Sequence, residues 1–119
     1  MEAQPDPQSL LPLPPAVFHI LVALAEGDRH GYSIMQDIAA RTDGKLRMSP
    51  GTLYGSIKRM LEDGLIVEVD ERPDPENDDE RRRYYRLTDF GRRVAAADAG
   101  RLQRVLNQAR ACGLVPKRS

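Results

Sequence analysis

Residues 49–65 read SPGTLYGSIKRMLEDGL, and this stretch decides the fold predicted for the chain. Ser49 is a favourable helix N-cap, and Pro50 suits the first helical position, where a backbone N–H is not required. Gly64 is placed to end the helix. Four apolar residues recur at helical spacing and form one face: Leu53, Ile57, Met60 and Leu61. The stretch therefore predicts an amphipathic helix that buries this face.

The opposite face of this predicted helix carries small side chains where the helix starts and basic side chains farther along. Its residues are Gly51, Thr52, Gly55, Lys58 and Arg59. Small side chains allow a close approach to another surface, and the two cations indicate that this surface is anionic. The face therefore suggests contact with a polyanion such as DNA.

The segments on either side of residues 49–65 predict two more helices and a β-hairpin. Apolar residues recur at helical spacing in two earlier segments. Two later segments, 65–70 and 82–87, alternate as strands joined by a long polar tip. Three helices followed by a hairpin is the order of a winged helix-turn-helix. We therefore predict a mainly α fold with a small β-hairpin, whose third helix reads DNA.

A last helix is predicted after Thr88, and its apolar stripe has no later element to cover it. The first helix is apolar on two sides, although so small a chain has few elements to cover both. A second copy of the chain is the expected cover, so we predict a homodimer. The residues predicted in the dimer interface are Val17, Phe18, Leu21, Val22, Leu102, Val105, Leu106 and Ala109.

These patterns divide the chain into four parts. They are a flexible N-terminal arm over 1–13, a winged helix-turn-helix domain over 14–88, a C-terminal dimerisation helix over 89–113 and a tail over 114–119. The arm is predicted to be loose because prolines and polar residues dominate it.

The net charge of the 119-residue chain is zero, with 18 basic and 18 acidic residues. This balance hides two blocks of opposite sign. Residues 70–80 hold seven acids and one arginine, a balance of −6, and residues 81–93 hold six arginines and one acid, a balance of +5. Local charge rather than net charge attracts phosphate, so the basic block favours DNA binding. Ordinary solvated surface is the alternative interpretation of both blocks.

The sequence gives no support for catalysis, metal binding or membrane insertion. Cys112 is the single cysteine, so no disulfide can form within one chain, which favours a reducing cytoplasm. The apolar run 16–25 is too short to cross a bilayer. His19 and His30 lack metal-ligand spacing, and no nucleophile, base and orienting group come together. We predict a cytoplasmic protein that is not an enzyme and that holds no metal or cofactor.

Four short motifs, in the same order, resemble the PadR family of bacterial transcriptional regulators. They are His30-Gly31-Tyr32, Ser49-Pro50-Gly51-Thr52-Leu53-Tyr54, Leu61-Glu62-Asp63-Gly64-Leu65-Ile66 and Arg83-Tyr84-Tyr85-Arg86-Leu87-Thr88-Asp89-Phe90-Gly91. The resemblance covers roughly residues 14–112. It implies a homodimeric winged-helix repressor, in which the last helix pairs the subunits and a small-molecule effector acts in some members. The single C-terminal helix resembles the short subfamily, whereas the acidic hairpin tip departs from the family pattern.

In a winged helix-turn-helix the start of the third helix enters the major groove, and basic residues nearby contact phosphates. The predicted DNA-binding residues are Ser49, Pro50, Gly51, Thr52, Tyr54, Gly55, Lys58, Arg59, Arg82 and Arg83. Tyr54 has two interpretations, packing or a phosphate contact. Arg59 also has two, a phosphate contact or an ion pair with Glu62 or Asp63. A dimer would bind double-stranded DNA at a pseudo-palindromic operator, with half-sites about 34–36 Å apart.

Two other functions are consistent with the same sequence. The fold can serve as a protein-interaction module, in keeping with the zero net charge. It can also act as a ligand sensor, with Phe18 and Val22 of the first helix lining a pocket between subunits. A steep salt dependence of duplex binding would favour DNA as the partner over a protein-interaction module.

Overall fold

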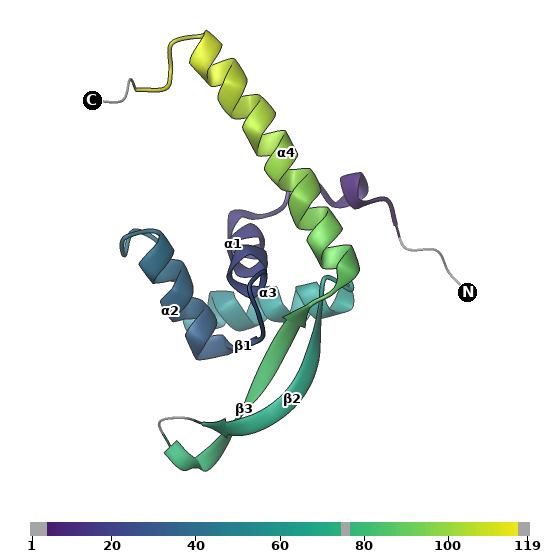
Figure 1. Cartoon of the computed structure of the whole chain (residues 1–119), viewed down its shortest axis with the longest axis vertical. Coiled ribbons are helices and arrows are strands. Elements are labelled where there is room, and N and C mark those ends of the chain that lie inside the picture. Colours follow the sequence, from purple (N-terminus) through teal and green to yellow (C-terminus); the bar gives the residue numbers. More distant parts are fainter. Residues whose placement is uncertain (1–4, 75–76, 117–119) are drawn as a thin grey trace.

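The protein is described by a computed structural model, which covers the backbone of residues 5–74 and 77–116 and their side chains other than those of 70–82. Its helices and strands, in order, are η1 (Pro7–Leu10, a 3-10 turn), α1 (Pro15–Leu24), β1 (Arg29–His30), α2 (Gly31–Arg41), α3 (Pro50–Glu62), β2 (Ile66–Asp74), β3 (Asn77–Leu87) and α4 (Asp89–Ala111). The hairpin and α4 project from the helical body in opposite directions (Figure 1). The predicted fold class, mainly α with a small β-hairpin in a winged helix-turn-helix, is confirmed.

Side-chain caps define where three of the helices begin. The Ser49 hydroxyl accepts a hydrogen bond from the Thr52 N–H at 3.2 Å, as predicted for the start of α3. At the start of α2, the Nδ1 atom of His30 accepts from the Ser33 N–H at 3.1 Å. Each cap satisfies a backbone donor that has no partner inside the helix, so these residues set the helix boundaries.

The three strands form an antiparallel sheet in the order β1-β3-β2. The strands of the hairpin are longer than predicted, because β2 continues through Pro73, where the sequence suggested a break. β2 lies at the edge of the sheet, and an edge strand tolerates proline because its outer N–H groups need no partner. The register shifts between Pro73 and Asp74, next to the turn.

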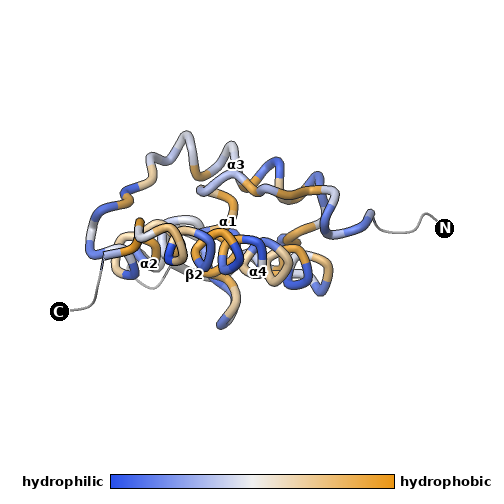
Figure 2. Tube along the Cα trace, turned by 90° about the horizontal axis from the view of Figure 1, so that it is seen from above, coloured by the Kyte–Doolittle hydropathy of each residue, from blue (hydrophilic) through white to orange (hydrophobic). Residues whose placement is uncertain are grey.

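The core is centred on α1. Four residues of this helix are buried almost completely: Ile20, Leu21, Ala23 and Leu24. Helices α2, α3 and α4 all contact α1, and in Figure 2 its hydrophobic residues lie near the centre of the molecule. The apolar face predicted for α3 also lies in this core, through Leu53, Ile57 and Met60. Helix α1 therefore holds both α3 and the projecting α4 in place.

From Pro7 to Leu13 the N-terminal segment is packed rather than loose, unlike the flexible arm predicted over residues 1–13, of which residues 1–4 lie outside the described part of the chain. Turn η1 contacts α4 beside it (Figure 1), and Leu13 is buried in the core. Leu10 and Leu11 are half-buried and pack against the same core. The physical reason is that three leucines lie among the prolines, and burying apolar side chains offsets the entropy lost on ordering the segment.

Helix α1 is apolar on two sides, and two of its apolar residues are buried by other parts of the same chain. Val17 is 5% exposed and Leu21 is 0% exposed, because α3, α4 and the N-terminal segment cover them. Burial within one chain accounts for these two side chains, and Leu21 also lines a groove between α1 and α4, so their contact with a second subunit stays a prediction. Phe18 and Val22 keep exposed surface, so their place in an interface stays a prediction.

A tight junction fixes α4 on the sheet. The Thr88 hydroxyl lies 2.7 Å from the carbonyl oxygen of Gly64, to which it donates, and it accepts from the Gly91 N–H at 2.9 Å. The backbone of Gly91 packs so closely against Leu65 that an added Cβ would collide with the Leu65 carbonyl oxygen. Only glycine fits at this position, so the direction of α4 depends on it.

We expect Gly91→Ala to destabilise the protein by about 1–3 kcal/mol, because the new methyl group meets backbone that cannot move aside. Gly100→Ala is the matched control in the same helix. A Cβ at Gly100 would meet only the Arg104 side chain, at 3.5 Å, so this change should stabilise the helix by up to about 1 kcal/mol. Urea unfolding followed by circular dichroism measures both, and equal stability of the two variants would contradict the proposed junction.

Candidate nucleic-acid interface

Helix α3 has one buried and one exposed face, as its sequence predicted. Leu53, Ile57 and Met60 are buried, and they turn the other side of the helix outward. The exposed residues at the predicted DNA-binding positions are Ser49, Pro50, Gly51, Thr52, Tyr54, Gly55, Lys58 and Arg59. The structure thus brings eight of the ten predicted positions together on a single helix and its cap.

The backbone at the start of this face is open to a close approach. A Cβ built on Gly55 would meet nothing within 4 Å, and one on Gly51 would meet only the Ser49 hydroxyl at 4.0 Å. Ser49 caps the Thr52 N–H, while the Gly51 N–H has no partner among the described residues. A helix N-terminus with a free, exposed N–H group attracts anions such as phosphate.

Tyr54 was predicted either to pack against the protein or to contact a phosphate, and its position is consistent with both. Its side chain is 49% exposed, yet its ring end lies against the start of α2, where a Cβ on Gly31 would come within 2.5 Å of the tyrosine hydroxyl oxygen. Gly31, in the His30-Gly31-Tyr32 motif, thus leaves room for the Tyr54 ring beside the start of α2, a contact that the sequence reasoning did not predict.

The two cations of α3 are free of internal partners. Neither Lys58 nor Arg59 makes an ion pair or side-chain hydrogen bond with any residue that the structure describes. The alternative that Arg59 pairs with Glu62 or Asp63 is thus not observed. Lys58 and Arg59 nevertheless share a shallow surface depression with both acids. The potential over the second half of α3 is therefore mixed rather than uniformly positive.

Two exposed arginines lie at the base of the hairpin, and each is close to a carboxylate. The Arg83 side chain is 63% exposed, with its Nε atom 3.8 Å from a carboxylate oxygen of Glu68. Arg86 donates to both carboxylate oxygens of Asp28, at 3.0 and 2.9 Å, and so connects β3 to the loop after α1. Both arginines therefore have a carboxylate partner, Glu68 for Arg83 and Asp28 for Arg86. The side chain of Arg82 lies outside the described residues.

Tyr85 lies in the core between these arginines, as its sequence suggested. Burial raises the pKa of its hydroxyl group, and the nearby charge of Glu68 raises it further. On the adjacent position of β3, the Tyr84 ring meets the His30 ring edge-on, with centroids 5.3 Å apart. The two tyrosines therefore fasten the hairpin to the start of α2 and do not form part of an exposed surface for phosphate.

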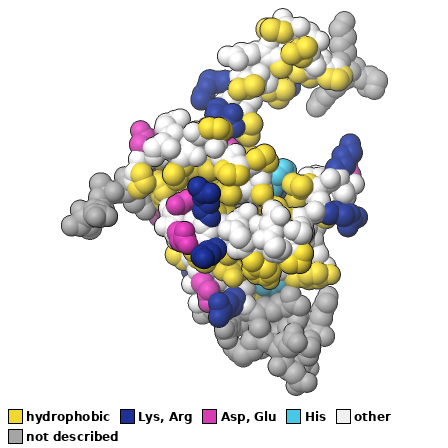
Figure 3. Space-filling view, turned by 180° about the vertical axis from the view of Figure 1, so that it is seen from behind, with side chains coloured by type: hydrophobic (Ala, Val, Ile, Leu, Met, Phe, Trp, Pro, Cys, Tyr) yellow, Lys and Arg dark blue, Asp and Glu magenta, His cyan; other side chains and the backbone are white. Residues whose placement is uncertain are grey.

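A second exposed surface runs along the projecting part of α4. Leu102, Val105 and Leu106 are 40%, 50% and 42% exposed, and Figure 3 shows hydrophobic side chains gathered on this helix. Ala109 continues the stripe and is half-buried. Nearer the body, a groove of about 270 Å³ lies between α1 and α4, lined by Phe18, Val22 and three alanines of α4. The structure leaves this apolar surface uncovered by described parts of the same chain.

The described residues contain neither a membrane-spanning helix nor a cluster of metal-binding side chains. No helix there combines the length and apolar character that a bilayer crossing requires. No three metal-binding side chains (histidine, cysteine, aspartate or glutamate) come together in the described part of the chain.

Comparison with known proteins identifies the family. Residues 20–97 match the Transcriptional regulator PadR-like family. Transcriptional regulator Rv3488 from Mycobacterium tuberculosis is 32% identical over 90 residues, which cover 76% of this chain and 78% of that protein. A relative from Lysinibacillus sphaericus, Uncharacterized protein X, is 36% identical over 73 residues. That match covers 61% of this chain and 64% of the relative, slightly less than two thirds of its length.

Solved structures share the same arrangement of helices and hairpin. A transcriptional regulator from Clostridium thermocellum is 28% identical, with a TM-score of 0.66 over 77% of this chain and 89% of that one. Bacillus subtilis PadR in complex with operator DNA is 20% identical, with a TM-score of 0.61 over 72% of this chain and 47% of that one, a likeness of fold alone. Because the family match spans more than half of the chain and the fold agrees, this protein belongs to the PadR-like family of transcriptional regulators.

Proposed function

We propose that the protein binds double-stranded DNA as a homodimer and represses transcription at a pseudo-palindromic operator. The observation that carries the proposal is the open face of α3, where the backbone at Gly51 and Gly55 has free space beside it and Lys58 has no partner among the described residues. A face that is small, exposed and flanked by a cation suits the approach of a helix to DNA. Bound at a promoter, such a dimer would exclude RNA polymerase.

In this proposal the first two turns of α3 enter the major groove. That groove is about 12 Å wide and admits an α-helix, whose N-terminal residues contact base edges. Gly51 and Gly55 let the backbone approach closely, and Thr52 presents a hydroxyl group to the bases. Ser49 and Pro50 set the start of the helix, so the N–H of Gly51 faces a phosphate.

Phosphate contacts come from the cations around this face. Lys58 and Arg59 lie farther along α3, and Arg83 lies on the hairpin with most of its side chain exposed. We place Arg82 beside Arg83 in the wing on its position in β3. Tyr54, which is exposed and whose hydroxyl lies beside Gly31 at the start of α2, would reach a neighbouring phosphate. These contacts position the protein, whereas the start of α3 selects the sequence.

The homodimer is proposed to form through the apolar stripe of α4 and the outer side of α1. Leu102, Val105, Leu106 and Ala109 supply the stripe, and Phe18 and Val22 border the groove beside it. A single winged domain makes too few contacts for tight specific binding. Two domains related by a two-fold axis would read half-sites about 34–36 Å apart.

Replacing Gly55 by glutamate should abolish DNA binding without harming the fold. Nothing lies within 4 Å of a Cβ there, and glutamate is the better helix former, so stability should stay equal or rise by up to about 1 kcal/mol. The carboxylate, however, would face phosphates and acceptor-rich base edges. Gly55→Gln is the control of the same size without the charge, and it should bind more tightly than Gly55→Glu.

Thermal melting and a mobility-shift titration with the selected operator separate the two effects. The operator is first obtained by selecting bound sequences from random duplex DNA. A Gly55→Glu protein that melts normally and still binds this DNA would show that α3 is not the reading helix.

Lys58→Ala should weaken binding to all DNA sequences by a similar factor, because a phosphate contact carries no sequence information. Each lost contact flattens the logarithmic salt dependence by about 0.9, so a dimer that loses two contacts should show a change of about 1.8. Arg104→Ala on α4 removes an exposed cation far from α3 and serves as control. The measurement is binding affinity against salt concentration, and an unchanged slope for Lys58→Ala would remove this residue from the interface.

The paired change Leu102→Glu and Leu106→Glu should convert the dimer to a monomer, since burying unpaired carboxylates is costly. The control pair Gln103→Glu and Asn107→Asp adds two acids to the same turns away from the apolar stripe and should leave the dimer intact. Sedimentation velocity at micromolar concentration distinguishes the two states. A monomeric wild-type protein, or equal dissociation of both pairs, would contradict the proposed interface.

A further inference from the structure

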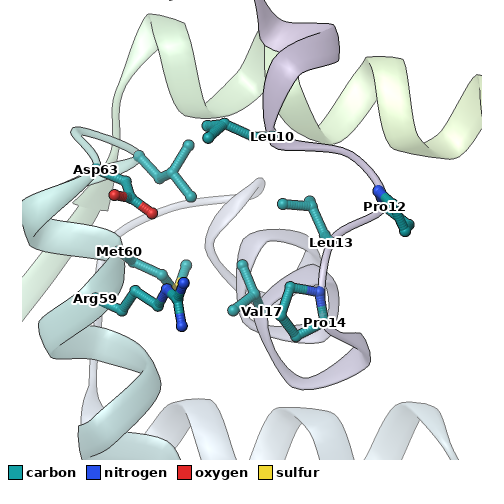
Figure 4. Close-up of a pocket in the computed structure, with 9 residues that line it drawn as sticks. Leu10, Pro12, Leu13, Pro14, Val17, Arg59, Met60 and Asp63 are labelled. Carbon is teal, nitrogen blue, oxygen red and sulfur yellow. The ribbon is translucent and has the colours of Figure 1, made fainter.

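A small pocket lies between the N-terminal segment and the C-terminal half of α3. Its volume is about 230 Å³. The N-terminal segment forms one wall through residues 10–14, and Val17, Met60 and Leu65 form the floor. In Figure 4 the side chains of Leu10, Leu13 and Val17 converge on this space from different directions. Seven of the nine lining residues are therefore apolar, and they come from parts of the chain that are distant in sequence.

The side of the pocket formed by α3 carries two opposite charges. Arg59 and Asp63 line it, and Figure 4 shows both side chains extending from α3 on this side of the pocket. They are four residues apart, yet they form no ion pair with each other or with any other described residue. A basic residue that precedes an acidic one along a helix is the less favourable order for such a pair. Both charges thus remain available to a ligand.

The two charges at the end of α3 indicate where the cationic and the anionic group of a ligand would bind. Helix α3 ends at Glu62, and Asp63 is its C-cap, so Asp63 lies at the negative end of the helix dipole. A cationic group is favoured there by both the carboxylate and the dipole. One turn earlier, the guanidinium of Arg59 favours a carboxylate, which it can bind through two parallel hydrogen bonds.

The size and lining restrict the ligand further. Pockets for drug-sized molecules measure about 300–1,000 Å³, and this pocket is smaller. The apolar floor and the N-terminal wall suit an aliphatic body. We propose that the pocket binds a small zwitterion with an aliphatic side chain, of the class of the apolar α-amino acids. Its ammonium would lie at Asp63, its carboxylate at Arg59 and its side chain on Val17, Met60 and Leu65.

Occupation of this pocket would also alter DNA binding, a consequence that rests on the proposed function. Arg59 lies on the exposed side of α3, so a ligand carboxylate would compete with phosphate for the same guanidinium. The ligand should therefore lower the affinity for the operator. The site itself does not depend on DNA and is tested without it.

The test uses L-leucine as the probe, in calorimetric titration and thermal melting of the full chain without DNA. We expect saturable binding and a raised melting temperature. Isocaproate, which lacks the ammonium, and isoamylamine, which lacks the carboxylate, should each bind at least about tenfold more weakly, since one charge-assisted contact is lost. Arg59→Gln and Asp63→Asn should weaken leucine binding by a similar factor. Lys58→Gln and Glu62→Gln, on the same helix but outside this pocket, should bind leucine like the wild type.

Two results would overturn the proposed site. One is the absence of saturable leucine binding up to about 10 mM, well above the ~1 mM affinity expected of so small a ligand. The other is leucine binding that Arg59→Gln and Asp63→Asn leave unchanged. A separate titration of operator DNA with and without leucine tests the regulatory consequence. Leucine binding with unaltered DNA affinity would contradict that consequence alone, and failure to bind any DNA would contradict the proposed function but not the pocket.

Discussion

Burial of one face of α3 against α1 is the constraint on which the rest of the structure depends. Leu53, Ile57 and Met60 have almost no exposed surface, so α3 cannot rotate about its axis without exposing them to water. Each such side chain contributes about 1.5–3 kcal/mol when fully buried. The same constraint presents Gly51 and Gly55 outward. The candidate reading face is thus a consequence of core packing and needs no stabilising contact of its own.

Two close contacts at glycine lie around this pair of helices. The Tyr54 side chain of α3 lies against Gly31 at the start of α2. Gly91 lies against the backbone of Leu65, which sets the direction in which α4 leaves the sheet. Interiors packed at this density transmit a displacement rather than absorb it. The spacing of two reading helices in a proposed dimer would therefore depend on contacts far from any DNA.

Some cations of the chain form ion pairs within the fold, whereas others have no partner among the described residues. Asp28 holds Arg86, Asp37 of α2 holds Arg29 of β1, and Glu26 after α1 holds Arg41 at the end of α2, so these arginines connect elements of the fold. Lys58 and Arg59 have no such partners among the described residues. This division explains how a chain of zero net charge can still present cations to phosphate. It also leaves Arg59 facing both the proposed DNA surface and the pocket under the N-terminal segment.

Helical spacing and capping chemistry are local, so the sequence alone predicted the helices of the winged domain and the outward face of α3. It predicted Ser49 as the cap and Gly55 as an open position, and both are found. Which elements cover an apolar side chain follows from the tertiary structure. Periodicity indicates that Val17 and Leu21 are buried, and the elements packed around α1 bury them within a single chain. The contact of Gly31 with Tyr54 was likewise not predicted, since a contact between two helices cannot be read from the residue pattern of either helix alone.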